Sequence, residues 1–282
     1  MDGITLVALP YDSGRFDERM GRGPLHLLES GLAERLRARQ PDVDVVTIRL
    51  AENLYSDAGA LVELQRRAVD ALRKSLAENR RILILSGNCG PAALGATAAL
   101  DPHKTGVIWF DAHADFNTPE TSASGFLDGM SLAILTGGCW AGVAARFARF
   151  EPIPEANVIL VGARDLDSPE ATALSRSQIT HVTAAKMDML AEAIEALSER
   201  VVHFYVHLDV DVLDTSEGSA NSYASGGGLS ADELYAALEL LQRSGRIRIA
   251  SITSYDPACD RDGSIRSIAT NAAAILAGSC CQ

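Results

Sequence analysis

The sequence has no surplus of basic residues, and this already argues against two classes of partner. Its 282 residues include 37 Asp and Glu against 25 Lys and Arg, which gives a formal net charge of -12 at pH 7. Nucleic acids and anionic membranes both bind proteins through a basic face, so we expect neither as a partner. The acidic surplus has two interpretations: a solvated surface or a binding site for cations.

Long apolar runs and a cysteine framework are also missing. No stretch of about 18 apolar residues occurs, so we expect no membrane span. The N-terminus shows no basic segment followed by an apolar one, as a secretory signal would. The five cysteines stand at positions 89, 139, 259, 280 and 281. An odd number of scattered cysteines in a chain of this length favours reduced thiols and a cytoplasmic protein.

Apolar, strand-like segments alternate with helical ones along the whole chain. We expect strands at 4–9, 43–48, 81–85, 106–110, 157–161, 180–183, 201–208 and 247–253. We expect helices at 24–39, 59–79, 90–100, 129–135, 168–177, 186–198, 231–244 and 264–278. This alternation predicts an α/β fold with three α/β/α layers around a mainly parallel sheet. No linker divides residues 1–282, so we expect a single domain, with its active site beyond the carboxyl ends of the strands.

Two of the expected strands run into clusters of acidic residues and histidine. The first ends in VIWFDAHAD, with Asp111, His113 and Asp115, and the second in HLDVDVLD, with Asp209 and Asp211. Side chains two residues apart share a face of a strand, so each cluster converges if the extended conformation continues through it. Four packed carboxylates repel one another unless a cation neutralises them. Oxygen ligands with one imidazole suit Mn²⁺ better than structural zinc, whereas the alternative for a single Asp is a helix N-cap.

Three motifs in this order resemble those of the ureohydrolases, the family of arginase, agmatinase and formimidoylglutamase. That family carries GGDH, DAHxD and SxDxDxxDP on a three-layer α/β/α fold, and this chain has SGNCG, DAHAD and HLDVDVLD in the same order. The resemblance implies two Mn²⁺ ions per chain. It implies that Asp111 and Asp209 bridge the ions, that Asp115 binds one of them, and that His113 and Asp211 bind the other.

Two further stretches, NTPETSASG and RDLDSPE, are similar to the arginase loops that recognise the amino-acid end of the substrate. The first would place Asn117 and Ser124 at the α-carboxylate, and the second would place Asp167 and Glu170 at the α-ammonium group. Neutral donors suit a carboxylate, and acids suit a cation. The alternative is a plain turn in the first stretch and a helix start in the second, with Ser168 as N-cap.

Two positions in the metal motifs differ from the family pattern. Cys89 stands where the glycine-rich motif supplies a histidine ligand. A thiolate is softer than Mn²⁺ prefers, so we expect Cys89 to be a weak ligand or to leave that side to water. His207 stands where the family has serine, and it is either an imidazole near the metals or a core histidine.

Two positions around the reacting end of the substrate differ as well. Asp128 replaces a histidine, and Ser254 replaces the glutamate that pairs with the guanidinium. An arginine guanidinium is always charged, and losing a buried partner costs roughly 3–5 kcal/mol, so we expect L-arginine to be a poor substrate. An N-hydroxyguanidine is less basic, and its O–H can donate to Asp128. These features are similar to those of a ureohydrolase that cleaves Nω-hydroxy-L-arginine in antibiotic biosynthesis.

The resemblance therefore implies a manganese amidinohydrolase that acts on a small guanidino amino acid and releases hydroxyurea and L-ornithine. A hydroxide between the metals would attack the guanidine carbon. Asp115 would transfer a proton to the departing nitrogen, and Asp128 would orient the hydroxyguanidine or act as acid and base. The alternatives are a ureohydrolase for another guanidino or formimino compound and a degenerate, non-catalytic member. Arginase trimers use a C-terminal extension, and this chain ends soon after its last helix, so we expect a monomer.

Overall fold

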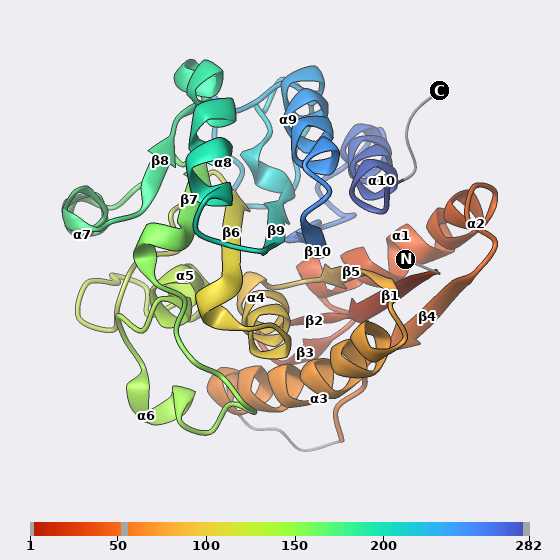
Figure 1. Ribbon diagram of the computed structural model, residues 1–282, viewed down its shortest axis with the longest axis horizontal. Helices are drawn as coiled ribbons and strands as arrows, with labels where there is room; N and C mark the ends of the chain where they lie inside the picture. Colours follow the sequence, from red (N-terminus) through yellow and green to blue (C-terminus); the bar gives the residue numbers. More distant parts are fainter. Residues whose placement is uncertain (1–2, 52–55, 279–282) are drawn as a thin grey trace.

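Eight parallel strands form the centre of the protein (Figure 1). The structure, a computed structural model, describes residues 3–51 and 56–278. In sheet order the strands are β4 (Val43–Thr47), β1 (Ile4–Leu9), β5 (Arg81–Ser86), β10 (Ile247–Thr253), β9 (His203–Asp209), β6 (Thr105–Phe110), β7 (Val158–Val161) and β8 (Thr180–Val182). All eight coincide with strands expected from the sequence, with ends that differ by at most two residues.

Helices cover both faces of this sheet (Figure 1). One face packs against α3 (Asp57–Ala77), α4 (Cys89–Ala99) and α5 (Ser131–Leu135). The other face packs against α1 (Gly23–Glu29), α2 (Leu32–Arg37), α8 (Leu190–Ser198), α9 (Ala231–Arg243) and α10 (Ser264–Leu276). The three-layer α/β/α fold expected from the sequence is thereby confirmed.

The strand side chains explain why two helical layers are needed. Along β6, Val107 and Trp109 belong to one buried apolar cluster, whereas Ile108 and Phe110 belong to the other. Successive side chains of a strand point to opposite faces, so a strand that is apolar at every position must be covered on both sides. The apolar runs in the sequence therefore specify a sheet buried in the middle layer.

Four details differ from the expectation. The helix expected over residues 24–39 is broken into α1 and α2, because Gly31 adopts a left-handed conformation with φ of 89°. The helix expected from 186 begins as a 3₁₀ segment, Ala184–Met189, which is distorted at Lys186, before α8 continues it. The short strands β2 (Tyr11–Asp12) and β3 (Arg15–Phe16) and the single-turn helix α6 (Ala141–Ala144) were not expected. Such short elements carry too few residues to show a period.

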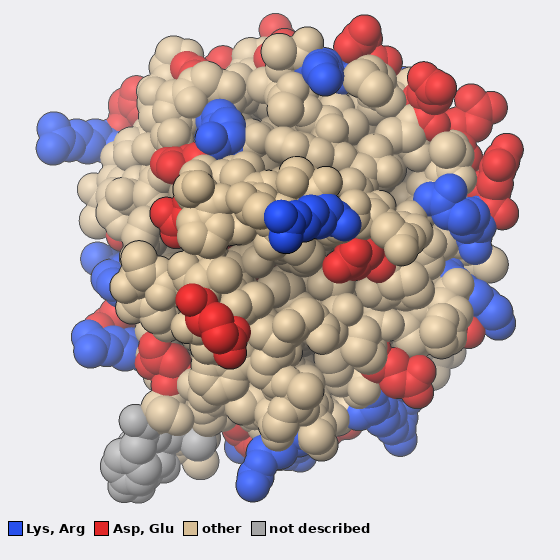
Figure 2. Space-filling view, turned by 90° about the vertical axis from the view of Figure 1, so that its left-hand side faces the viewer, with Lys and Arg blue, Asp and Glu red and all other residues tan. Residues whose placement is uncertain are grey.

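The surface drawn in Figure 2 carries no large basic patch. Its basic side chains are scattered singly, with acidic ones between them. No helix in the described ranges is long and apolar enough to span a bilayer. Cys89, Cys139 and Cys259 are free thiols, whereas Cys280 and Cys281, also expected to be reduced, lie outside the described residues.

Candidate active site

The acidic clusters meet at the carboxyl ends of the central strands. Asp111 directly follows β6, Asp209 is the last residue of β9, and Asp211 lies in the 3₁₀ turn Val210–Val212. Their exposed fractions are 1%, 4% and 2%. The Nδ1 atom of His113 lies 3.3 Å from Oδ1 of Asp111 and 3.5 Å from Oδ2 of Asp211. The structure thus brings together carboxylates from two strands that are neighbours in the sheet.

We expected each cluster to converge because its strand continues through it, and this expectation is wrong. The extended conformation ends before the last residues of both clusters. Strand β6 ends at Phe110, and Asp115 adopts a left-handed φ of 49°. Its backbone carbonyl accepts hydrogen bonds from the N–H groups of Leu132 and Ala133, at the start of α5. The chain therefore bends, and the bend rather than the pleat of the strand brings Asp115 to the site.

The second cluster is also shaped by a turn. The carboxylate of Asp209 accepts a hydrogen bond of 2.9 Å from the backbone N–H of Asp211, as an N-cap does. Its other oxygen, Oδ2, lies 3.2 Å from the Sγ atom of Cys89. Asp209 thus combines the capping role that was the alternative with a position inside the acidic cluster.

Burial and mutual repulsion dominate the electrostatics of these acids. Burial and the Asp211 charge raise the pKa of Asp111 to about 6 and that of Asp209 well above its usual range. Burial and the Asp111 charge likewise raise the pKa of Asp115. Burial lowers the pKa of His113, but its hydrogen bond to Asp111 and the nearby acidic charges outweigh this and raise it to about 9. Such a set of groups attracts positive charge, and a bound divalent cation satisfies it.

Two groups of side chains place their ligand atoms close enough to hold a metal ion. In one group, atoms of Asp111, His113 and Asp211 lie within 4.8 Å of one another, and in the other those of Cys89, Asp111 and His207 do. Asp111 belongs to both groups. The donor set of the first group is carboxylate oxygen and imidazole nitrogen, which fits Mn²⁺.

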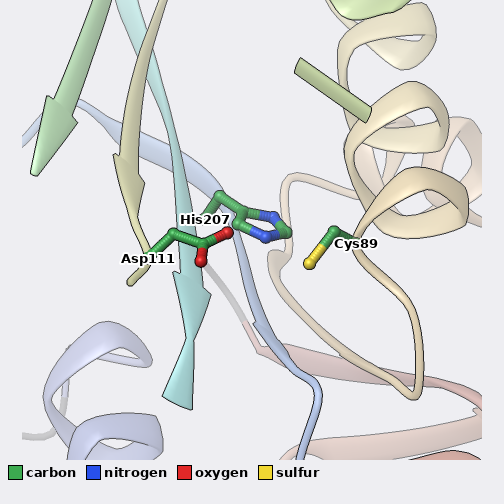
Figure 3. A group of neighbouring side chains, drawn as sticks. All are labelled: Cys89, Asp111 and His207. Carbon is green, nitrogen blue, oxygen red and sulfur yellow. The ribbon is translucent and has the colours of Figure 1, made fainter. Parts of the chain in front are cut away.

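The second group is shown in Figure 3. The Asp111 carboxylate, just after β6, points toward the His207 ring, which comes from β9. The thiol of Cys89, at the start of α4, points toward the same ring from its other side. Burial and the charge of Asp209 raise the pKa of the Cys89 thiol. The thiol lies 3.4 Å from Oγ1 of Thr253 and 3.5 Å from Oγ of Ser254, so it sits among hydroxyl groups and one acid.

His207 has partners within the core of the protein. Its ring is fully buried and stacks on Trp109 with 3.7 Å between the ring centroids. Its Nδ1 atom lies 2.8 Å from the Tyr205 hydroxyl and 3.0 Å from that of Ser251, and its Nε2 atom lies 3.3 Å from that of Thr253. Burial lowers the pKa of His207 to about 3, so the ring is neutral. Of the two interpretations of His207, these contacts favour the core histidine.

The hydrogen bonds of Asp128 leave no acceptor position for either of its expected roles, orienting a hydroxyguanidine or acting as acid and base. Its Oδ2 atom accepts hydrogen bonds of 2.9 Å from the side-chain amide of Asn88 and the backbone N–H of Cys89. Its Oδ1 atom accepts bonds from the backbone N–H of Gly90, at 2.9 Å, and the hydroxyl of Ser131, at 3.1 Å. A carboxylate has about four acceptor positions, and all four are used here. Asp128 therefore caps the N-terminus of α4 and holds Cys89 in place.

Three of the four residues expected at the amino-acid end of the substrate lie together. The side-chain amide of Asn117 donates to Oδ2 of Asp167 over 3.5 Å, and Oε1 of Glu170 accepts a bond of 2.8 Å from the backbone N–H of Phe116. The N-cap of α7 (Ser168–Arg176) is Asp167, and Ser168 is the first helical residue, so Ser168 is not the cap. Ser124 is exposed, and its hydroxyl accepts a bond from the backbone N–H of Phe126.

A cavity of about 210 Å³ connects these groups. It is lined by Met20, Cys89, His113, Asp115, Asn117, Phe126, Asp128, Gly129, Asp165, Asp167, Glu170, Asp209, Asp211, Asn221, Tyr223 and Ser254. Ser124 is not among these residues. We call the buried acids Asp115, Asp209 and Asp211 the floor of the cavity. We call the more exposed Phe126, Asp165, Asp167 and Tyr223 its mouth.

Sequence reasoning missed several of the lining residues. Asn221 is 2% exposed, and its amide donates to Oδ2 of Asp211 and to the backbone carbonyl of Ser254. Ser254, which the sequence did predict at the substrate, has a left-handed φ of 62° and lines the cavity. Met20, Phe126 and Tyr223 were missed too. Asn221, Met20, Phe126 and Tyr223 lie in segments outside the expected helices and strands, where no periodic signal identifies a buried side chain.

Arg164, part of the RDLDSPE stretch, holds the segment that carries Asp211 and Asn221. Its guanidinium donates to the backbone carbonyls of Gly162, Asp211, Val212, Leu213, Ser225 and Gly226. A guanidinium has five N–H donors in a fixed plane, and lysine cannot reproduce this arrangement. Arg164 is therefore a positioning residue for one side of the site.

A sequence model of the arginase family matches residues 2–281. The chain belongs to the arginase family. It is 31% identical to an arginase of Staphylococcus aureus strain MSSA476, over 91% of each chain. Two solved structures are similar to it: the arginase of Bacillus caldovelox, with 28% identity, a TM-score of 0.87 and coverage of 99% and 98%, and that of Bacillus subtilis, with 27% identity, a TM-score of 0.89 and coverage of 100% of both chains.

Membership of this family settles the class of reaction. The protein is a metal-dependent hydrolase that acts on guanidino or amidino groups. The acidic floor and the groups of potential ligands are the part of the structure that fits such chemistry.

Proposed function

We propose that the protein is a manganese-dependent amidinohydrolase that hydrolyses Nω-hydroxy-L-arginine to hydroxyurea and L-ornithine. The observation that carries this proposal is the chemistry of the cavity beside its floor. There the neutral hydroxyl of Ser254 faces the cavity, and the acid nearest to α4, Asp128, has all its acceptor positions filled by the protein. In this part of the cavity, the described residues outside the floor therefore offer a charged guanidinium no carboxylate with a free acceptor position.

The metal site would use the floor and its neighbours. Asp111 and Asp209 would bridge two Mn²⁺ ions, Asp115 would bind one ion, and His113 and Asp211 would bind the other. Bound divalent cations would act as Lewis acids and lower the pKa of a water molecule to near neutrality. The Sγ atom of Cys89 lies 3.2 Å from Oδ2 of Asp209. Cys89 would complete the site on that side either as a weak ligand or as a thiol that donates a hydrogen bond to Asp209.

The substrate preference follows from the basicity of the guanidine. The hydroxyl group of an N-hydroxyguanidine withdraws electrons and makes the group less basic, so it enters without the buried carboxylate that an arginine guanidinium needs. Leaving a buried charge without its partner costs roughly 3–5 kcal/mol, or about 150- to 4,000-fold in binding. Ser254 can exchange a hydrogen bond with the hydroxyguanidine, since a hydroxyl both donates and accepts.

The other end of the substrate would be held by the neighbouring loops. Asp167 and Glu170 supply carboxylates for the α-ammonium group, and Asn117 supplies an amide for the α-carboxylate. Ser124 would reach a substrate only if its loop moved, because it does not line the cavity. Hydrolysis adds water across the guanidine carbon, and Asp115 would pass a proton to the departing nitrogen of ornithine. Asp128 would position α4 rather than move a proton.

A panel of substrates with the manganese-loaded protein tests the proposal. We expect kcat/KM for Nω-hydroxy-L-arginine to exceed that for L-arginine by about 100-fold or more, with hydroxyurea as product. Faster hydrolysis of L-arginine would contradict the proposal. A protein that retains no manganese after loading would instead support the degenerate alternative.

A pair of variants at Ser254 sharpens this test. Ser254→Glu restores an acid for a charged guanidinium, so we expect it to shift the preference toward L-arginine by about tenfold or more. Ser254→Ala is the matched control, because both replacements must adopt the same left-handed backbone and therefore share its strain. The alanine variant should not gain activity on L-arginine.

A further inference from the structure

Three large, mainly apolar side chains are among the residues that line the cavity, whose lining is otherwise mostly polar. They are Met20, Phe126 and Tyr223, and each comes from a different segment of the chain. Met20 lies in the 3₁₀ turn Arg19–Arg22, Phe126 precedes the 3₁₀ turn Asp128–Met130, and Tyr223 lies between β9 and α9. Acidic groups occupy the floor, and Asp165 and Asp167 occupy part of the mouth.

Phe126 and Tyr223 form a stacked pair at the mouth. Their ring centroids are 5.7 Å apart and their planes differ by 20°. Tyr223 is 41% exposed, so the pair lies on the side of the cavity that opens to solvent. Offset stacking of this kind stabilises an aromatic pair beyond the area it buries.

Each ring is held by its own loop. The backbone N–H of Phe126 donates to the Ser124 hydroxyl. The backbone N–H of Tyr223 donates to the side-chain oxygen of Asn221, and the amide of Asn221 in turn donates to Asp211 on the floor. The position of the Tyr223 loop is therefore tied to the position of a floor carboxylate.

We propose that Phe126 and Tyr223 are specificity-determining residues that select substrates by the length of their methylene chain. This rests on the proposed function, since a guanidino amino acid carries a polar group at each end and methylene groups between them. The floor holds one polar end and the acids at the mouth hold the other. The aromatic pair and Met20 contact the methylene groups, which would otherwise remain in water when both ends are bound.

The physical basis is that one methylene group in an apolar site changes specificity by about 10- to 200-fold. A chain that is too short cannot reach both polar ends, and one that is too long must buckle against the stacked rings. Aromatic rings suit this task because they are rigid and present a flat apolar face. An open mouth of acids alone would tolerate chains of several lengths.

Single and paired variants test the proposal. Phe126→Ala and Tyr223→Ala remove the rings, and Phe126→Tyr and Tyr223→Phe are matched controls that keep them. The substrates are Nω-hydroxy-L-arginine, its homologues with one methylene fewer or more, and the corresponding series of unhydroxylated L-arginine homologues. KM and kcat are measured for each, with manganese content as a readout of the floor.

We expect the wild-type protein to prefer one chain length by about tenfold or more in kcat/KM. Each alanine variant should raise KM for that substrate about tenfold, reduce the length preference to less than about threefold, and leave manganese content unchanged. The ring-retaining variants should keep the wild-type preference for chain length. Because the rings act as one wall, the double alanine variant should lose little more than either single variant.

The outcomes separate this proposal from the proposed function. If the unhydroxylated series is hydrolysed faster, the proposed function fails, and the same comparison of chain lengths still decides the role of the rings. Alanine variants that keep the wild-type KM and length preference would overturn the inference while leaving the proposed function intact. If neither series is hydrolysed and L-ornithine does not bind in calorimetry, both are overturned.

Discussion

The floor and the mouth of the cavity are built in different ways. The floor acids lie at or just beyond the ends of central strands, and Asp209 and Asp211 are at most 4% exposed. The mouth is built from loops, and Asp165, Asp167 and Tyr223 are exposed. Burial makes each charge at the floor costly unless a cation is bound, whereas solvent screens the charges at the mouth. The floor is thus suited to chemistry, and the mouth to discrimination between substrates.

Removing one floor carboxylate should have the largest effect. In Asp209→Asn we expect the affinity for manganese and kcat/KM each to fall by about 100-fold or more, because a neutral amide replaces a buried anionic ligand. Metal content after dialysis and steady-state kinetics measure the two effects. Asp165→Asn, at the mouth, is the control and should keep its manganese. Retention of full manganese by Asp209→Asn would mean that the floor is not the metal site.

An acid at the mouth should matter less and in a different way. In Asp167→Ala we expect kcat/KM for an α-amino acid substrate to fall by about tenfold, mainly through KM, because the exposed carboxylate binds an ammonium group in a screened environment. Manganese content should stay unchanged. A substrate analogue without the α-ammonium group provides the control, since its kinetics should not respond to the change. An equal loss for both substrates would show that Asp167 supports the structure rather than recognising the ammonium group.

The smallest expected effect is on the pH dependence of the stability of the metal-free protein. The pKa of Asp111, about 6, lies above its ordinary value, so the free energy of unfolding contributed by this group falls as the pH rises through 6. The pKa of His113, about 9, is also raised, so its contribution is complete below about 6.5 and is lost as the pH rises through 9. Both groups predict a Tm of the metal-free protein that falls by about 5 °C between pH 5 and pH 9.

Calorimetry with and without manganese measures this effect. The metal stabilises the folded protein more as the pH rises, because its ligands must be deprotonated to bind it. The difference in Tm between loaded and metal-free protein should therefore grow with pH. The variant Asp111→Asn should show a shallower pH dependence in the metal-free state. A Tm of the metal-free protein that rises over this pH range would contradict the raised pKa values of Asp111 and His113.

Particular residues show how far the sequence predicts the site. The apolar runs predict all eight central strands. The position of the two acidic motifs at the ends of expected strands predicts that Asp111, His113, Asp209 and Asp211 gather at one edge of the sheet. The sequence did not predict how Asp115 reaches the site, because its left-handed backbone depends on contacts with α5. It also did not predict that Asp128 caps α4, since Cys89 and Asp128 lie far apart in the sequence.

The role of a polar residue in a loop depends on which partners the fold places beside it. Asn221, Phe126 and Tyr223 follow no periodic pattern, and only the packing of three loops makes them line one cavity. The sequence by itself determined the strands, the layers and the acidic motifs, because period and composition are local properties of the chain. The tertiary structure alone decided which hydrogen bonds fill the oxygens of Asp128 and which rings meet at the mouth, because those contacts join residues that the sequence leaves unrelated.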